Sequence, residues 1–74
     1  MTTRKNLTSF EAKCLYVLSF DRRTLHESTL MVYGDKYIRE GTRGGKQRAV
    51  REAFERLEKT GLVKYDRGKY RKVA

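Results

Sequence analysis

The side chains best suited to chemistry lie between residues 42 and 51, where basic and amide groups precede any acid. At about 100° per residue, Arg48 and Arg51 point away from the apolar stripe of the helix predicted to begin here. A guanidinium can donate two hydrogen bonds to the O6 and N7 of guanine, and Gln47 can pair with adenine. Lys46 can bind a phosphate. These residue types predict contacts with nucleic acid.

The same helix face has an alternative interpretation as an ordinary solvated surface. Oppositely charged side chains four residues apart on a helix can pair with one another. Three such pairs are available, namely Arg48 with Glu52, Arg51 with Glu55, and Glu55 with Lys59. Both interpretations stay open for any single residue of this face.

Two glycines precede this helix and leave its first backbone amides uncovered. Unpaired amides and the helix dipole favour negative charge at a helix N-terminus, so Gly44 and Gly45 can admit a phosphate. Thr42 and Arg43 can reinforce such a contact. The alternative is that the glycines only allow the chain to turn.

No catalytic or metal-binding pattern accompanies these residues. The Gly-Gly-Lys run is not a P-loop, because Glu40 stands where its first glycine is needed and Gln47 replaces the magnesium-binding serine or threonine. Cys14 is a single cysteine on an apolar stripe, and the lone His26 suggests a surface residue. We therefore expect a protein that is not an enzyme, with no cofactor and no metal ion.

The C-terminal segment carries a second basic group. From Leu62 onward the only acid is Asp66, among the basic residues Lys64, Arg67, Lys69, Arg71 and Lys72. A hairpin tip bearing Arg67 suits a phosphate or the minor groove. The alternative is that the lysines protect exposed strand edges from aggregation. Tyr65 and Tyr70 are expected to pack across the hairpin.

Length and charge bound what the chain can be. Its 74 residues allow one domain, spanning 1–74, and a formal net charge of +9 predicts a polyanionic partner. There is no run of about 20 apolar residues and no secretory signal after Met1, so we expect an intracellular protein with no membrane partner.

Helical spacing predicts two helices in the first half of the chain. Thr8 and Glu11 form a capping-box pattern, and the apolar spacing that follows predicts a helix to about Phe20. Residues 21–23 form a polar break. A second helix begins between residues 24 and 28 and is expected to run to Glu40, where Gly41 would end it. Two alternatives stay open: Gly34 ends the helix, or residues 29–33 form a strand.

The second half predicts one long helix and a hairpin. After a flexible turn at residues 41–45, the spacing of Val50, Ala53, Phe54 and Leu57 indicates a helix from Lys46 that stops at Gly61. Residues 62–65 and 69–73 are β-prone runs around a turn at 66–68, where Gly68 supplies positive φ.

Residues 50–63, VREAFERLEKTGLV, resemble the third helix and first wing strand of winged helix-turn-helix transcription regulators, and the similarity continues through residue 70. In its compactness the chain also resembles the small regulators carried by viruses and plasmids, including archaeal ones. The resemblance implies an α+β fold, with a three-helix core followed by a C-terminal β-hairpin wing. It places the third helix in the major groove and the wing beside it.

The charge and the resemblance both favour a double-stranded DNA-binding transcription regulator. Two alternatives fit parts of the pattern: a basic RNA-binding or ribosome-associated domain, and a winged helix used for protein interaction. A homodimer is expected, because a single small domain covers few base pairs and two-fold sites add affinity.

Overall fold

The computed structural model describes residues 7–73, which form four α-helices and one antiparallel β-hairpin. The chain is therefore an α+β protein, as its sequence predicts. In chain order the elements are α1 (Ser9–Val17), α2 (Leu25–Tyr33), α3 (Asp35–Glu40), the 3₁₀ turn η2 (Gly41–Gly44), α4 (Lys46–Lys59), β1 (Val63–Asp66) and β2 (Lys69–Lys72). None of the helices in this described part is long and apolar enough to cross a membrane.

Capping boxes start the first two helices, as predicted. The hydroxyl of Thr8 accepts a hydrogen bond from the Glu11 amide (3.1 Å), and the Glu11 carboxylate accepts one from the Thr8 amide (3.1 Å). Thr24 and Glu27 repeat this arrangement at the start of α2, at 3.1 and 3.0 Å. Each box satisfies two amides that a helix start otherwise leaves without a partner. These short patterns therefore determine where both helices begin.

The first helix ends at Val17, earlier than the predicted end near Phe20. The guanidinium of Arg23 donates from Nε to the carbonyl oxygen of Val17 at 2.8 Å. The amides of Leu18 and Ser19 bond three residues back, which is typical of a tightened last turn. The side chain of Phe20 lies beyond this turn and is exposed.

The expected single second helix is wrong, because Gly34 divides it into α2 and α3. Gly34 has φ 62° and ψ −132°, a conformation that residues with a Cβ rarely adopt. The alternative in which Gly34 ends the helix is the observed one, and residues 29–33 are helical rather than extended. Gly41 has positive φ and ends α3, as predicted. The 3₁₀ turn η2 then replaces the expected irregular turn.

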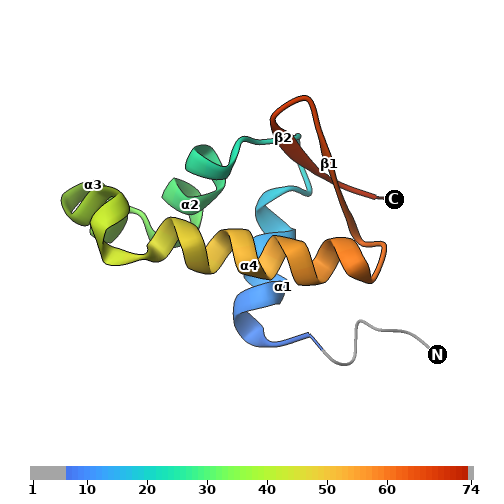
Figure 1. The fold of residues 1–74 in the computed structure, drawn as a ribbon, viewed down its shortest axis with the longest axis horizontal. Coiled ribbons are helices and arrows are strands. Elements are labelled where there is room, and N and C mark those ends of the chain that lie inside the picture. Colours follow the sequence, from blue (N-terminus) through green and yellow to red (C-terminus); the bar gives the residue numbers. More distant parts are fainter. Residues whose placement is uncertain (1–6, 74) are drawn as a thin grey trace.

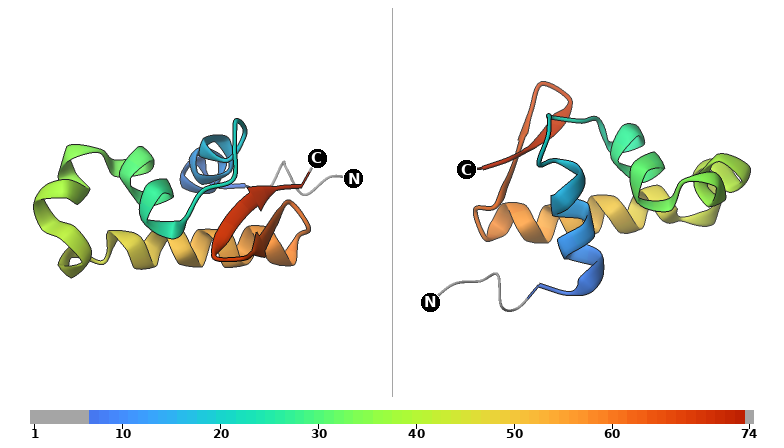
Figure 2. Two further views of the ribbon diagram at one scale, coloured as in Figure 1. Left: turned by 90° about the horizontal axis from the view of Figure 1, so that it is seen from above. Right: turned by 180° about the vertical axis from the view of Figure 1, so that it is seen from behind.

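The predicted third helix is α4, which forms the centre of the core. Its apolar stripe of Val50, Ala53, Phe54 and Leu57 is fully buried. α1 and α2 both contact α4 and each other, so three helices form the core as predicted. α1 crosses α4, and α3 lies beyond the N-terminal end of α4 (Figures 1 and 2). The molecule is consequently elongated, with extents of 40 × 25 × 18 Å.

The hairpin turns through two residues, Arg67 and Gly68. Their φ values are 54° and 83°, and positive φ at both positions is the property of a type I′ turn, whose twist matches that of the two strands. The positive φ of Gly68 is as predicted. The turn is one residue shorter than predicted, because Asp66 belongs to β1 and pairs with Lys69.

A bridge that the sequence did not predict attaches the hairpin to the helices. Arg23 and Tyr70 exchange two backbone hydrogen bonds, of 2.9 and 2.8 Å. The ring of Tyr70 also lies against Phe54 of α4, with centroids 4.5 Å apart. Tyr65 is opposite Tyr70 with centroids 4.8 Å apart, so the two tyrosines pack across the hairpin as predicted. Main-chain and side-chain contacts therefore hold the hairpin against the core. The hairpin lies beside the C-terminal half of α4 (Figure 2).

Candidate nucleic-acid interface

Arg48 and Arg51 lie on the outward face of α4. The Arg48 side chain is 76% exposed, and its Nε is 3.9 Å from Glu52 Oε2. Such an exposed pair contributes little free energy. The other two pairs considered, Arg51 with Glu55 and Glu55 with Lys59, do not come within ion-pair distance in the described part of the chain. Both arginines are therefore accessible to a partner.

A shallow groove brings Gln47 beside these two arginines. Leu25, in the first turn of α2, lines a hollow of about 160 Å³ together with Gln47, Arg48 and Arg51. Gln47 is half-buried, and its Nε2 donates to the hydroxyl of Tyr37 at 3.3 Å. The fold thus places three of the predicted contact residues around one groove, which we call the α4 groove.

Two other side chains of the protein contact the ammonium group of Lys46. Its ammonium forms an ion pair with the Glu40 carboxylate and lies 5.5 Å from the centroid of the Tyr33 ring. Only 17% of its side chain is exposed. A phosphate at Lys46 would therefore compete with Glu40. The side chain of Thr42, also a predicted contact, lies outside what the structure describes.

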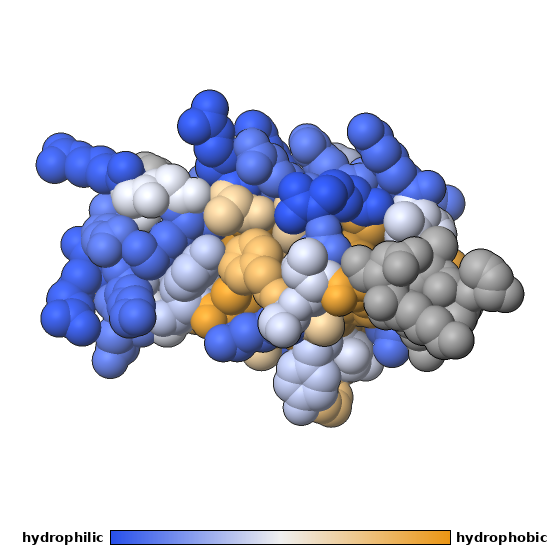
Figure 3. All heavy atoms as spheres, turned by 90° about the horizontal axis from the view of Figure 1, so that it is seen from below, coloured by the Kyte–Doolittle hydropathy of each residue, from blue (hydrophilic) through white to orange (hydrophobic). Residues whose placement is uncertain are grey.

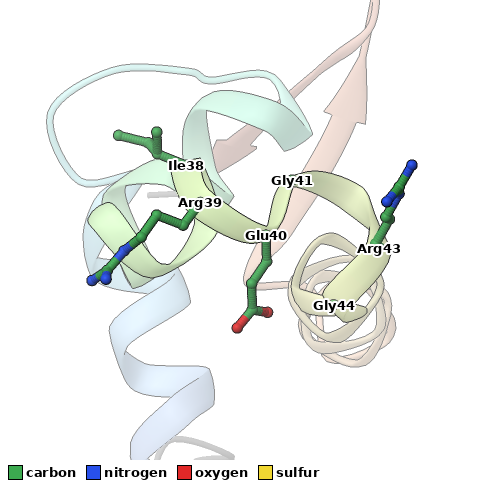
Figure 4. Close-up of a pocket in the computed structure, with 6 residues that line it drawn as sticks. All are labelled: Ile38, Arg39, Glu40, Gly41, Arg43 and Gly44. Atoms are coloured by element: carbon green, nitrogen blue, oxygen red, sulfur yellow. The ribbon is translucent and has the colours of Figure 1, made fainter.

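The turn before α4 lies beside the same carboxylate. Gly45 is the N-cap residue, and no side chain caps α4, as the glycines predict. A Cβ at Gly44 would meet the carboxylate of Glu40, so the Glu40 side chain would have to shift to admit one. In the hollow of about 510 Å³ drawn in Figure 4, Glu40 points inward between α3 and η2, while Arg39 and Arg43 point away on opposite sides. Arg43 is exposed and is not part of the α4 groove.

The hairpin presents Lys64, Arg67 and Lys69 to solvent. The pKa of Glu27, in the first turn of α2, is lowered chiefly by the hydrogen bond from the Thr24 amide and further by positive charges that include Lys69. Lys69 precedes Tyr70, whose backbone bridges Arg23 just before α2, so Lys69 lies near the segment that lines the α4 groove.

Arg71 lies apart from this group. It is half-buried and, with Lys72, lines a hollow of about 380 Å³ beside residues 18–22 at the end of α1. Directly opposite residues of an antiparallel pair share a face, so Arg71 and Lys64 occupy the face away from the Tyr65 and Tyr70 rings. The structure does not bring Arg71 together with the arginines of α4.

His26 is an exposed residue at the start of α2, as predicted, but its ring also contacts Tyr37. Its Nδ1 lies 2.8 Å from the hydroxyl of Tyr37, and the ring centroids are 5.3 Å apart. Tyr37 itself is only 2% exposed. Sequence spacing could not reveal this contact, because Gly34 redirects the chain between the two residues. The roles of Arg23 and Glu40 were also missed, since the partner of each lies in another element.

An aromatic surface lies outside the candidate interface. Seen from below, hydrophobic residues gather near the centre of the molecule and hydrophilic ones cover one long edge (Figure 3). Tyr16 of α1 and Phe20 are both exposed, and their rings meet edge to face with centroids 5.6 Å apart. Neither residue belongs to the basic groups described above.

Comparison of the chain with protein-family models, with curated proteins and with solved structures finds no match. Function is therefore inferred from the residues and their geometry.

Proposed function

We propose that this domain is a winged helix-turn-helix protein that binds double-stranded DNA and regulates transcription inside the cell. α4 is the recognition helix in the major groove, and the hairpin is the wing on the phosphate backbone or minor groove. The observation that carries the proposal is the groove in which Gln47, Arg48 and Arg51 lie together, on the helix that also packs against the hairpin.

The fold supports this assignment of roles. Three helices form the core, and the hairpin follows the third of them. The Arg23–Tyr70 bridge and the Phe54–Tyr70 contact restrain the hairpin relative to α4. A rigid scaffold of this kind can present both basic elements to one duplex, because the spacing between them does not change.

The dimensions of the partner favour DNA over RNA. An α-helix with side chains is about 10–12 Å across, and the major groove of B-DNA is about 12 Å wide. The major groove of an RNA duplex is deep and narrow, so side chains on a helix cannot read it. Exposed arginines on the outward face of α4 therefore fit duplex DNA better than duplex RNA.

A competition experiment tests the choice of partner. Labelled duplex DNA bound to the protein is displaced by unlabelled DNA or by duplex RNA of the same sequence. We expect DNA to displace the label at a concentration roughly tenfold lower than RNA, since only DNA admits the helix. Preferential displacement by RNA would contradict the proposal and favour an RNA-binding domain.

A pair of triple variants tests the surface. Arg48→Ala, Arg51→Ala and Arg67→Ala remove three charges from the candidate interface, while Lys13→Ala, Arg22→Ala and Lys36→Ala remove three exposed charges elsewhere. Both triple variants lower the net charge equally, so a general electrostatic effect weakens them alike. We expect the first to bind roughly tenfold more weakly than the second. Equal binding by both would overturn the assignment and favour a different binding surface or a protein-interaction role.

Homodimerisation on a two-fold site stays a prediction. Sedimentation of the protein with and without its DNA site measures it. Two copies per duplex would support it, and one copy at saturation would contradict it.

A further inference from the structure

Tyr37 connects three helices through one hydroxyl group. The ring is buried, and the hydroxyl lies 2.8 Å from Nδ1 of His26 in α2 and 3.3 Å from Nε2 of Gln47 in α4. A hydroxyl can donate one hydrogen bond while it accepts another. When His26 carries its proton on Nε2, the Tyr37 hydroxyl donates to Nδ1 and accepts from Gln47.

This arrangement leaves one edge of the Gln47 amide unused. The amide nitrogen has two hydrogens, and the bond to Tyr37 takes one of them. The carbonyl oxygen and one N–H remain. When Tyr37 accepts the N–H that points away from the carbonyl oxygen, the oxygen and the remaining N–H form the edge that pairs with N6 and N7 of adenine. Gln47 also lines the α4 groove with Arg48 and Arg51, so its amide lies beside two side chains that can bind guanine.

We propose that Tyr37 is a positioning residue that orients the Gln47 amide to read one adenine in the DNA site. The inference rests on the proposed function and adds a base preference to it. The Gln47–Tyr37 hydrogen bond, at 3.3 Å, is slightly longer than the usual range, and we infer from it a restraint on the direction of the amide. A free glutamine side chain loses rotamer freedom when it binds a base, and one already held by Tyr37 loses less.

Tyr37→Phe tests this role with little change in packing, because it removes the hydroxyl and keeps the buried ring. Tyr16→Phe is the matched control, since it makes the same chemical change at an exposed residue on α1. A preferred duplex is first selected with the wild-type protein, and each base pair is then replaced in turn. The dissociation constant is measured for wild type, Tyr37→Phe, Tyr16→Phe and Gln47→Ala.

We expect replacement of one A·T pair by G·C to weaken wild-type binding by roughly tenfold, the range of a two-bond base contact. Gln47→Ala should abolish the preference at that pair. Tyr37→Phe should reduce it to less than about threefold while the preference at guanine positions stays. Tyr16→Phe should behave as wild type. A general loss of stability would weaken binding at every position alike, so the position-specific loss separates positioning from a structural role.

The titrations distinguish failure of the Tyr37 positioning role from failure of the proposed DNA binding. If the wild-type protein discriminates among duplexes but Tyr37→Phe keeps the full adenine preference, the positioning role is wrong. If the wild-type protein discriminates among no duplexes, both proposals are wrong.

A measurement on the unmodified protein adds a test that needs no variant, namely the NMR order parameter of the Gln47 side-chain amide. An amide restrained by Tyr37 should have an order parameter closer to that of rigid backbone, roughly 0.85, than to that of flexible groups, and a value below about 0.6 would overturn the inference.

Discussion

The carboxylate of Glu11 and the guanidinium of Arg56 form an ion pair that joins α1 to α4. Glu11 is only 7% exposed, and the same carboxylate caps α1 through the Thr8 amide. The hydrogen bond from Arg56 is the main reason that the pKa of Glu11 lies below its ordinary value of 4.5, followed by the bond from Thr8. Arg56 thus contributes to the packing of α1 on α4, so we do not include it in the candidate interface.

The lowered pKa of Glu11 predicts how stability depends on pH. A carboxyl group whose pKa is lower in the folded than in the unfolded state stabilises the fold above its unfolded pKa. That contribution is lost as the pH falls below about 4.5 and through the folded pKa. We expect Glu11→Gln to have a lower free energy of unfolding than wild type at neutral pH. On acidification, the free energy of unfolding of the variant should fall by less than that of wild type. Urea unfolding at several pH values measures this, and parallel curves for the two proteins would contradict it.

Leu57→Ala should destabilise the domain strongly. Leu57 is fully buried in the α4 stripe, and truncation of such a side chain costs about 2–5 kcal/mol because it leaves a cavity. Leu62→Ala serves as the control, since Leu62 is only half-buried at the edge of the core. Chemical denaturation measures both variants. A loss below about 1 kcal/mol at Leu57 would mean that α4 packs through another face.

Cys14 should behave as a core residue. Burial raises the pKa of its thiol to about 12, so almost no thiolate is present at neutral pH. We expect thiol reagents to modify it only when the protein unfolds, and Cys14→Ser to lower stability without changing DNA affinity in the folded fraction. Rapid modification of the native protein, or DNA binding that depends on metal or oxidant, would show that the thiol has another role.

Glu40→Gln should release Lys46 to the DNA backbone. The Glu40 carboxylate now pairs with the Lys46 ammonium at the start of α4. We expect tighter binding to random DNA, and a slope of log affinity against log salt that is steeper by about 0.9 if Lys46 then binds one further phosphate. Glu58→Gln makes the same charge change at an exposed position late in α4. Equal salt slopes for the two variants would mean that the Glu40–Lys46 pair does not limit phosphate binding.

Much of this fold could be predicted because its determinants are local. The Thr8 and Thr24 capping boxes act over three residues, and the stripe around Phe54 repeats every three or four. Gly68 supplies the positive φ that a tight hairpin turn needs. Each feature could be identified from neighbouring residues without knowledge of the tertiary structure.

The remaining features depend on contacts that local spacing does not encode. The cost of a glycine inside a helix, about 1 kcal/mol, does not decide whether Gly34 breaks the helix, because tertiary packing can outweigh it. The break in turn places Tyr37 between α2 and α4. The Arg23–Tyr70 bridge joins segments far apart in the sequence. Of the candidate site, the outward face of α4 was predictable, but the partners of Gln47 and Lys46 were not.

If α4 reads bases and the hairpin binds the phosphate backbone, variants of the two elements should differ in binding titrations on two DNAs. Arg48→Ala, Arg51→Ala, Lys64→Ala, Arg67→Ala and Lys69→Ala are each titrated against a selected site and a scrambled site at several salt concentrations, with Lys13→Ala as the control. A contact to a base edge carries sequence information, whereas a contact to a phosphate carries almost none.

We expect the two α4 variants to lose about 1–3 kcal/mol on the selected site and far less on the scrambled one. The hairpin variants should weaken binding to both DNAs alike and lower the salt slope by about 0.9 for each phosphate that the variant no longer binds. Arg67→Ala is the exception if the Arg67 side chain enters the minor groove. Its loss of affinity would then depend on the A·T content of the DNA. Equal losses on both DNAs for the α4 variants, together with loss of discrimination for the hairpin variants, would contradict the account and reverse the two roles.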